Sequence, residues 1–410
     1  MNNYIKYIRN EFSIFNKKIN GFPLSYLDNA ASSHMPKNSI NVLKTYYENS
    51  HSNIHRGTYY LSEKNTYQFE NTRQKIKIYI NAKYTEECIF VKGTTEAINL
   101  IASTFGEKYI KENDEIIITE MEHHSNIIPW QTLCKKKKAI LKILPIKING
   151  ELDIKQLNEL LSKNTKLISI IFISNVLGTI NPIKHIINIA QKKGIYTLID
   201  GAQALSHLDV DVQNINCDFF TFSAHKLYGP TGLGILYCKK YLLNNIQPYQ
   251  TGGSMVSNVH FNKSFYKNIP HKFEAGTPTI ANVIAFGETL NFLQSIDKNI
   301  IYKHESELLK YANYKLLKIP ELNIIGNSIN KTNIISFTIK NIHSHDISTI
   351  ANEYGVAVRA GHHCAIPIMN FFKIPATTRL SIGMYNTYKE IDMLYKSLLH
   401  TIKLFKKIRN

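Results

Sequence analysis

Short apolar runs alternate with longer amphipathic stretches along the chain between about residues 86 and 240. Apolar runs bounded by polar turns are typical of buried β-strands, and the amphipathic stretches have helical length. Predicted strands lie at 88–91, 115–119, 141–146, 167–174, 195–200, 219–223 and 233–238. This alternation predicts an α/β domain with a mostly parallel seven-stranded sheet that is covered on both faces. Because too little chain for a crossover helix separates the last two runs, we expect them to pair antiparallel.

The pattern changes beyond about residue 285 to long amphipathic helices with few strands. Helices are predicted over 282–295, 302–317, 344–354 and 389–407, and a strand over 333–339. Thr387 and Glu390 have the spacing of a capping box at the start of the last helix. We therefore predict a large domain over residues 22–285. A smaller α+β domain would combine residues 286–410 with an amphipathic N-terminal segment, residues 1–21.

The chain has 410 residues, a net charge of +18 and a hydrophobic fraction of 44%, which is ordinary for a folded protein. No apolar run approaches the roughly 20 residues of a membrane span. The N-terminus lacks the apolar core and cleavage site of a secretory signal, so we expect a cytoplasmic protein with no membrane partner. Positive charge is not gathered into a stripe with aromatic residues, so nucleic acid is not an expected partner.

Five cysteines are spread along the chain without a CxxC pair. Their odd number and wide spacing argue against a disulfide framework or a structural zinc site. Cys88 and Cys238 fall inside apolar runs and are predicted core residues. Cys364 differs from them, because it lies in a polar, glycine-containing loop.

Chemically distinctive residues follow several predicted strands at their carboxyl ends, where open parallel sheets bind ligands. Thr94 and Thr95 open a helix whose hydroxyls and free N–H groups suit a phosphate, although threonine is also a common helix cap. Asp200 ends the fifth run, and Lys226 follows the sixth in a Ser-Ala-His-Lys sequence. Pyridoxal phosphate (PLP) needs a lysine for a Schiff base, a carboxylate for its ring nitrogen and donors for its phosphate. The set as a whole therefore predicts a PLP site.

Two further features allow more than one interpretation. His123, at the end of the second run, suits metal binding, acid–base catalysis, ring stacking or no special role. Cys364 lies between Arg359 and Arg379 and beside two histidines, so we expect its thiolate form to be favoured. A thiolate beside a PLP site indicates attack on a substrate sulfur; the alternative is an incidental exposed cysteine. Residues 362–364 cannot readily surround one tetrahedral ion because they are consecutive, so no metal site is predicted.

Nine segments together resemble the group II cysteine desulfurases of the SUF system, also called selenocysteine lyases. They are LDNAASS (27–33), NIHRGTY (53–59), GTTEAINL (93–100), EHHSNIIPW (122–130), SNVLGT (174–179), DGAQA (200–204), FSAHKLYGPTG (222–232), EAGTP (274–278) and RAGHHCA (359–365). The resemblance covers about residues 8–406. The housekeeping desulfurases are less similar, because their catalytic cysteine lies in a longer loop. The resembled group belongs to the class-V aminotransferases, which have the PLP-dependent transferase fold of type I.

The resemblance implies PLP as cofactor, a homodimer with active sites near the subunit interface, and conversion of L-cysteine to L-alanine with a persulfide on Cys364. Lys226 would carry the cofactor, and His123 would stack on its ring and assist proton transfer. Further cofactor contacts would come from Asp200 at the ring nitrogen, Gln203 at the ring oxygen, Thr94, Thr95, Ser223 and His225 at the phosphate, and Thr277 at the phosphate of the partner subunit. Asn175 and Arg379 would bind the substrate carboxylate, and Arg359 and His55 would line the site.

The same resemblance implies L-selenocysteine as a second substrate, a SufE-like sulfur acceptor and a SufBCD scaffold for iron–sulfur cluster assembly. Thr251 and Ala360 stand where the family usually has glycine and threonine, and neither change removes a chemical group that the reaction needs. The alternative is another fold-type I PLP enzyme, an aminotransferase or a kynureninase-like lyase. Such an enzyme would share Asp200 and Lys226 but would not need Cys364.

Overall fold

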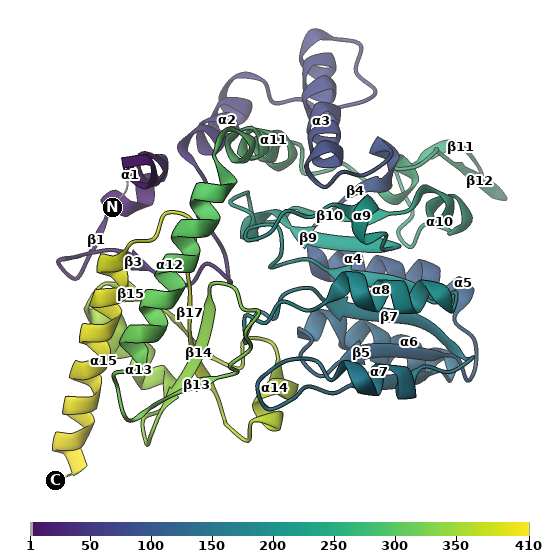
Figure 1. Ribbon diagram of the computed structural model, residues 1–410. Helices are drawn as coiled ribbons and strands as arrows, with labels where there is room; N and C mark the ends of the chain where they lie inside the picture. Colours follow the sequence, from purple (N-terminus) through teal and green to yellow (C-terminus); the bar gives the residue numbers. More distant parts are fainter. Residues whose placement is uncertain (1–2, 410) are drawn as a thin grey trace.

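The computed structural model describes residues 3–409, whose strands form one large and one smaller main sheet (Figure 1). The helices are α1 Asn3–Asn10, α2 Lys37–Asn49, α3 Tyr60–Tyr79, α4 Thr94–Ile101, α5 Glu107–Tyr109, α6 Ile128–Lys137, α7 Ile154–Leu160, α8 Ile183–Lys192, α9 Val212–Ile215, α10 Lys240–Asn245, α11 Ile280–Ser295, α12 Lys298–Leu316, α13 Ser344–Glu353, α14 Ile366–Phe371 and α15 Tyr388–Arg409. The strands are β1 Lys18–Ile19, β2 Phe22–Pro23, β3 Ser25–Tyr26, β4 Cys88–Val91, β5 Glu115–Thr119, β6 Ile140–Leu144, β7 Thr165–Ile171, β8 Tyr196–Asp200, β9 Phe219–Ser223, β10 Gly234–Cys238, β11 Val256–His260, β12 Lys263–Tyr266, β13 Leu322–Ile325, β14 Ile334–Ile339, β15 Val356–Ala357, β16 Arg359–Gly361 and β17 Thr377–Ser381. Within the described residues, no helix is long and apolar enough to span a bilayer.

The large sheet has seven strands in the order β4-β10-β9-β8-β7-β5-β6. The five neighbouring strands β9, β8, β7, β5 and β6 run parallel to one another. Strand β10 runs antiparallel to both of its neighbours, β9 and β4. The predicted seven-stranded, mostly parallel sheet is confirmed, as is the antiparallel pairing of its last two strands.

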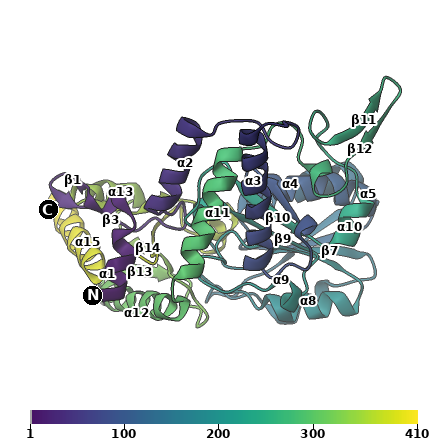
Figure 2. The same cartoon turned by 90° about the horizontal axis from the view of Figure 1, so that it is seen from above.

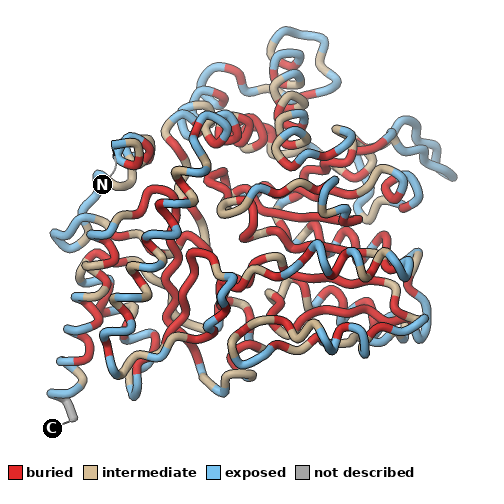
Figure 3. The backbone as a smooth tube through the Cα atoms, in the orientation of Figure 1, coloured by how far each residue is buried: buried red, intermediate tan, exposed pale blue. Residues whose placement is uncertain are grey.

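Side chains from the two faces of this sheet enter two separate apolar clusters. Ile117, Ile168 and Ile199 belong to a cluster that includes α8, whereas Ile116 and Leu198 belong to another that includes α4. Helices accordingly lie on both sides of the strands (Figure 2), and the strands themselves are largely buried (Figure 3). Burial on both faces explains why these strands are continuous apolar runs.

The smaller sheet has four antiparallel strands in the order β13-β14-β17-β16. It packs with α12, α13 and α15 around a third apolar cluster. The predicted strand over 333–339 is β14, whereas β16 and β17 were not predicted. Their sequences, RAG and TTRLS, carry arginine, glycine and threonine in place of an apolar run, so hydrophobic pattern gives no signal for them.

The N-terminal segment contacts both parts of the molecule. Ile5 and Ile8 of α1 are buried in the cluster of the large sheet. Arg9 donates to the Tyr385 carbonyl at 2.7 Å and pairs with Glu390 of α15 at 3.1 Å. Glu390 also accepts from the Thr387 amide at 2.6 Å, which confirms one half of the predicted capping box. The other half would be a bond from the Glu390 amide to the Thr387 hydroxyl. Instead, this hydroxyl lies 3.2 Å from the Glu390 carboxylate.

Residues 25–33 connect the two sheets. Strand β3 pairs in parallel with β15, and the Ser381 amide at the end of β17 donates to the Leu27 carbonyl at 2.7 Å. A few residues later, the Ser33 amide donates to the His225 carbonyl, and the Ser33 hydroxyl accepts from the Tyr228 amide. The segment therefore holds the loop after β9 next to the end of β17.

A buried ion pair ties α3 to the loop before α11. Arg73 is 1% exposed, and its guanidinium donates to the Glu274 carboxylate at 2.6 and 2.9 Å and to the Cys88 carbonyl at 2.8 Å. Burial favours the neutral form of Glu274, but the Arg73 cation outweighs it and lowers the pKa of Glu274 to about 2. Arg73 also donates to the partly exposed Glu70 carboxylate at 2.8 Å, so loss of Glu274 would remove the buried one of its two counter-charges.

We expect Glu274→Gln to destabilise the protein by about 3 kcal/mol at pH 7, because Arg73 keeps its charge and loses its buried partner. The folded pKa of Glu274 lies below its value in the unfolded chain, so the difference between the two proteins should disappear as the pH falls from about 4 towards 2. Urea unfolding over this pH range measures it. Glu159→Gln, at an exposed site, is the matched control, and equal midpoints for both variants would contradict the expectation.

Candidate active site

A cavity of about 230 Å³ lies at the carboxyl ends of the central strands, between the large sheet and β16–β17. Most of the predicted site residues line it: Thr94, Thr95, His123, Asn175, Asp200, Gln203, Ser223, His225, Lys226, Arg359 and Arg379. They come from loops that follow several different strands. The parallel topology therefore gathers residues that are far apart in sequence, as expected for an open α/β sheet.

Lys226 and Asp200 are the two oppositely charged groups on the large-sheet side of the cavity. Burial lowers the pKa of the Lys226 amine, although Asp200 acts in the opposite direction. Burial also raises the pKa of Asp200, whose carboxylate accepts from the Ala202 amide at 2.9 Å. A lysine with a lowered pKa is a better nucleophile towards a carbonyl group. A buried carboxylate gains from a cationic ring nitrogen.

Hydroxyl groups and amides surround the start of α4. The Thr94 amide donates to the Ser223 hydroxyl at 2.9 Å, and the two hydroxyls lie 3.0 Å apart. Thr95 shares a hydrogen bond of 2.7 Å with Ser125. His225, opposite them, is kept neutral because burial lowers its pKa to about 4. Several hydroxyls beside a helix N-terminus make a suitable phosphate site.

His123 has a defined tautomer. Its Nδ1 accepts from the Ser125 amide at 3.1 Å, so this nitrogen carries no proton. Burial, with a smaller effect of the Lys226 cation, lowers the pKa of His123 to about 3. The neutral ring therefore carries its proton on Nε2, which leaves a hydrogen-bond donor for the cavity.

Gln203 is tied to the connecting segment. Its side chain is 2% exposed, and Nε2 donates to the Ala30 carbonyl at 2.7 Å. This bond fixes the amide in the wall of the cavity and leaves its oxygen and one N–H to serve a ligand.

Arg379 is a buried cation on the opposite wall. It is 1% exposed, and its guanidinium donates to Asp28 at 2.8 Å and to the Asn175 carbonyl at 2.9 Å. Arg379 Nε is buried with no partner among residues 3–409. Arg359 lies directly across the ladder from it, on β16. Two guanidinium groups with one carboxylate between them give this wall a positive charge that suits a ligand carboxylate.

Asn175 is already engaged. Its Nδ2 donates to the His363 carbonyl at 2.7 Å, while Oδ1 is buried without a partner in the described part of the chain. Direct binding of a carboxylate by Asn175 would require this bond to exchange, whereas its free oxygen suits an N–H donor.

The Cys364 loop is held at the rim of the cavity. The His124 amide donates to the Cys364 carbonyl at 2.8 Å, and His124 Nε2 accepts from the Ile366 amide at 3.1 Å. His363 and Cys364 both have positive φ, 52° and 56°, which non-glycine residues rarely adopt. His363 lines the cavity, and the charge of a Cys364 thiolate would act on both Lys226 and Arg379. The Cys364 loop and Lys226 therefore border the same cavity.

Besides Cys364, whose neighbour His363 lines the cavity, two of the predicted residues do not line it. His55 is close to Glu70, with 3.8 Å between its Nε2 and the carboxylate, and to the ring of His271. Thr277 is exposed. The cofactor and substrate roles assigned to these two residues stay predictions.

Sequence reasoning missed Asp28 and Ser125, which hold Arg379 and His123 in place. Asp28 lies just beyond β3, a strand of two residues, Ser25–Tyr26, which is too short to give the apolar run whose end identified Asp200. Ser125 is two residues beyond His123, but its contacts depend on the turn that the chain makes, which a serine alone does not indicate.

The cavity residues fit pyridoxal phosphate on their own chemistry. They supply a buried amine, a buried carboxylate, hydroxyl donors at a helix start, and a flat imidazole. These are the partners that an aldehyde, a pyridine nitrogen, a phosphate and an aromatic ring require.

Comparisons with known proteins agree with this chemistry. The model of the family described as aminotransferase class-V matches residues 25–394. The cysteine desulfurase of Wigglesworthia glossinidia brevipalpis is 46% identical over 409 residues, covering 99% of this chain and 100% of that protein. A probable cysteine desulfurase of Halalkalibacterium halodurans is 44% identical over 398 residues, covering 97% and 98%.

Solved structures show the same fold. The cysteine desulfurase CsdA of Escherichia coli has a TM-score of 0.91 and 31% identity, with 98% of each chain covered. The apo cysteine desulfurase of Thermococcus onnurineus NA1 has a TM-score of 0.92 and 31% identity, covering 97% of this chain and 98% of that one. The predicted PLP-dependent fold of type I is confirmed. The chain belongs to the aminotransferase class-V family and, within it, to the cysteine desulfurases, which are PLP-dependent enzymes.

We expect His123 to stay neutral, with its proton on Nε2, from pH 8 down to pH 5, because its pKa in the folded protein is about 3. Nitrogen chemical shifts of ¹⁵N-histidine-labelled protein, assigned by comparison with His123→Gln, report both the charge and the tautomer. In the urea-unfolded chain the same residue should titrate near about 6.5. A shift change centred between pH 6 and 7 in the folded protein would contradict the expectation.

Proposed function

We propose that this enzyme uses pyridoxal phosphate on Lys226 to convert L-cysteine to L-alanine, leaving the sulfur as a persulfide on Cys364. The observation that carries the proposal is that one cavity joins the buried amine of Lys226 to the loop of Cys364. The identity to cysteine desulfurases over nearly the full chain supports the same activity.

The cofactor, when bound, supplies an electron sink that makes the bonds at the substrate Cα easier to break. Lys226 would hold it, with Asp200 at its ring nitrogen and Gln203 at its ring oxygen. Its phosphate would be held by Thr94, Thr95, Ser223 and His225. His123 would face its ring.

Arg379 and Arg359 would bind the substrate carboxylate and so fix which Cα bond faces the lysine. Arg379 is suited to this because Asp28 and Asn175 hold its guanidinium rigidly, which avoids an ordering cost when the substrate arrives. Asn175, which contacts both Arg379 and the Cys364 loop, would couple the two ends of the bound amino acid.

Proton transfer and sulfur transfer would then use separate residues. Lys226 would accept the Cα proton in its amine form, and burial, which lowers the pKa of this group, favours that form. The Cys364 thiolate attacks the substrate sulfur: an S–S bond forms, the Cβ–S bond breaks, and its electron pair remains with the carbon skeleton. A proton at Cβ completes alanine, and the Nε2–H of His123 is a suitable donor.

A homodimer is part of the proposal. Large apolar side chains are exposed at the start of α3 and on the β11–β12 hairpin, including Tyr60, Tyr67, Phe261 and Phe265. In Figure 1, α3 stands at the top of the molecule and the β11–β12 hairpin extends at its upper right. Apolar surface of this kind is typical of subunit contacts. Thr277 and His55, which do not line the cavity of their own chain, would then face the site of the partner subunit.

The persulfide requires an acceptor, and we propose a SufE-like protein and the SufBCD scaffold of iron–sulfur cluster assembly, in the cytoplasm. Selenocysteine would be a second substrate. An aminotransferase or kynureninase-like activity remains the alternative, but neither requires the hydrogen bonds that fix the Cys364 loop.

We expect Cys364→Ser to lose sulfur transfer from L-cysteine by at least about 100-fold, because the serine hydroxyl cannot accept sulfur as a persulfide. The cofactor absorbance near the visible edge should remain. Alanine release and persulfide labelling measure the loss, and Cys134→Ala, at a buried cysteine in α6, is the control. Full alanine production by Cys364→Ser would show that Cys364 is not the nucleophile.

We expect the purified protein to have twice the 47.1 kDa mass of one chain, as measured by size-exclusion chromatography with light scattering. The double substitution Phe261→Asp and Phe265→Asp should shift the mass towards one chain, since it places charge in an apolar contact. A native mass of 47.1 kDa at micromolar concentration would refute the proposed dimer.

A further inference from the structure

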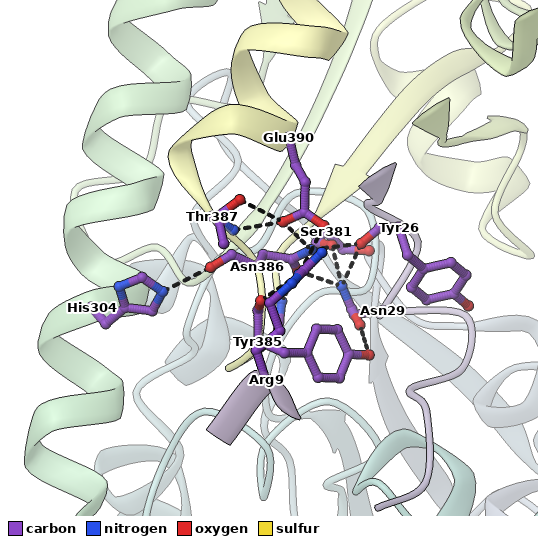
Figure 4. A network of polar contacts seen from close by, with 10 residues as sticks. Arg9, Tyr26, Asn29, His304, Ser381, Tyr385, Asn386, Thr387 and Glu390 are labelled. Carbon is purple, nitrogen blue, oxygen red and sulfur yellow. Dashed lines mark hydrogen bonds and ion pairs between the residues drawn. The ribbon is translucent and has the colours of Figure 1, made fainter. Parts of the chain in front are cut away.

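A buried polar network lies around the end of β17, close in sequence to Arg379 (Figure 4). It combines Asn29 of the connecting segment, Ser381 of β17, and Asn386, whose side chain leads to Glu390 of α15. Each of these four residues is 7% exposed or less. Buried polar groups in such number are costly unless all of them are paired.

Asn386 is the centre of the network. Its Nδ2 donates to the Tyr26 carbonyl at 2.8 Å and to Glu390 at 3.2 Å. Its Oδ1 accepts from Asn29 at 3.0 Å and from the Gly383 amide at 2.7 Å. All four hydrogen-bonding sites of a fully buried amide are therefore used. No other side chain has two donors and two acceptors in this arrangement except the longer glutamine.

Asn29 carries the network to the connecting segment. Its Nδ2 also donates to the Ser381 carbonyl at 2.8 Å, and its Oδ1 accepts from the Tyr385 hydroxyl. The next residue, Ala30, donates its amide to the Ser381 hydroxyl at 2.8 Å. Residues 28–30 are thereby fixed against β17 in one register.

The two neighbours of Asn29 each hold a residue of the cavity. Asp28 pairs with Arg379, and the Ala30 carbonyl accepts from Gln203. Ser381 and Arg379 are two positions apart on β17, so they share a face of the strand. A shift of the segment along β17 would therefore move Asp28 relative to Arg379.

We propose that Asn386 is a positioning residue for substrate binding. By fixing residues 28–30 against β17, it holds Asp28 where the Arg379 guanidinium is aimed at the substrate carboxylate. Asn386 touches no group of the cavity itself, because Tyr26, Asn29, Gly383 and Glu390 are its side-chain partners. The proposal rests on the proposed role of Arg379 in carboxylate binding.

The test compares two ligands that differ in the carboxylate: L-alanine and L-alaninol, in which a hydroxymethyl group replaces it. Binding to the holoenzyme is measured from the change in cofactor absorbance. We expect Asn386→Ala to weaken L-alanine by about tenfold, since small displacements of a charged group are costly at a binding site. Binding of L-alaninol should change less than about twofold. General damage to the cofactor pocket would weaken both ligands equally.

Thr401→Val is the matched control. Thr401 is fully buried in α15 and donates to the Ser397 carbonyl at 2.8 Å, so this change also removes a buried hydrogen bond from the smaller domain. It lies outside the network and should leave the ratio of the two affinities unchanged. If Thr401→Val lowers the affinity for L-alanine relative to L-alaninol as much as Asn386→Ala does, the proposal is overturned.

Gly383→Ala tests the same idea without removing a polar group. A Cβ at this position would lie 2.9 Å from the Asn29 oxygen, so it must displace Asn29. We expect the same selective loss of L-alanine binding, and this variant decides the matter if Asn386→Ala does not fold. The proposal is overturned if Gly383→Ala keeps the wild-type preference for L-alanine and Asn386→Ala either keeps it too or does not fold.

Arg379→Ala separates the two proposals. If the wild-type protein binds L-alaninol as tightly as L-alanine, or if Arg379→Ala keeps the preference for L-alanine, the carboxylate role of Arg379 fails and the positioning role fails with it. If Arg379→Ala loses the preference while Asn386→Ala and Gly383→Ala keep it, the carboxylate role stands and the positioning role alone is wrong.

Discussion

The buried guanidinium of Arg379 is the constraint on which the arrangement of the site depends. A charge that is 1% exposed needs a counter-charge and hydrogen-bond acceptors close to it. Asp28 supplies the first and the Asn175 carbonyl the second, so one residue pulls together β17, the connecting segment and the loop after β7. Because those loops belong to different sheets, the cavity exists only when the two sheets are held together.

The remaining charges of the cavity follow from the same burial. Asp200 has a raised pKa and Lys226 a lowered one, so burial disfavours the charged form of each. A ligand with a carbonyl group for the Lys226 amine and a basic ring nitrogen for the Asp200 carboxylate would offset the unfavourable burial of these two groups. The protein is thus arranged for a cofactor with these two groups, while the arginines on the opposite wall are arranged for an anion.

The large sheet was predictable because both faces of its inner strands are buried, which makes most of these strands continuous apolar runs. The strand-end rule then located Thr94, Asp200 and Lys226. The same reasoning failed for β16 and β17, where Arg359 and Arg379 face the cavity and interrupt any apolar pattern. Asp28 was overlooked for a related reason, since its partner is 351 positions away in the chain.

The sequence by itself determined the succession of strands and helices, and it identified the residue types that pyridoxal chemistry requires. Local hydrophobic period and motif spacing are properties of short stretches of chain, so they can be read without a structure. Only the tertiary structure decided that residues 27–30 lie against β17, that Ser125 holds His123 in one tautomer, and that Asn175 is already bonded to His363. These contacts join distant segments or depend on the exact path of a turn, and no local pattern of side chains specifies them.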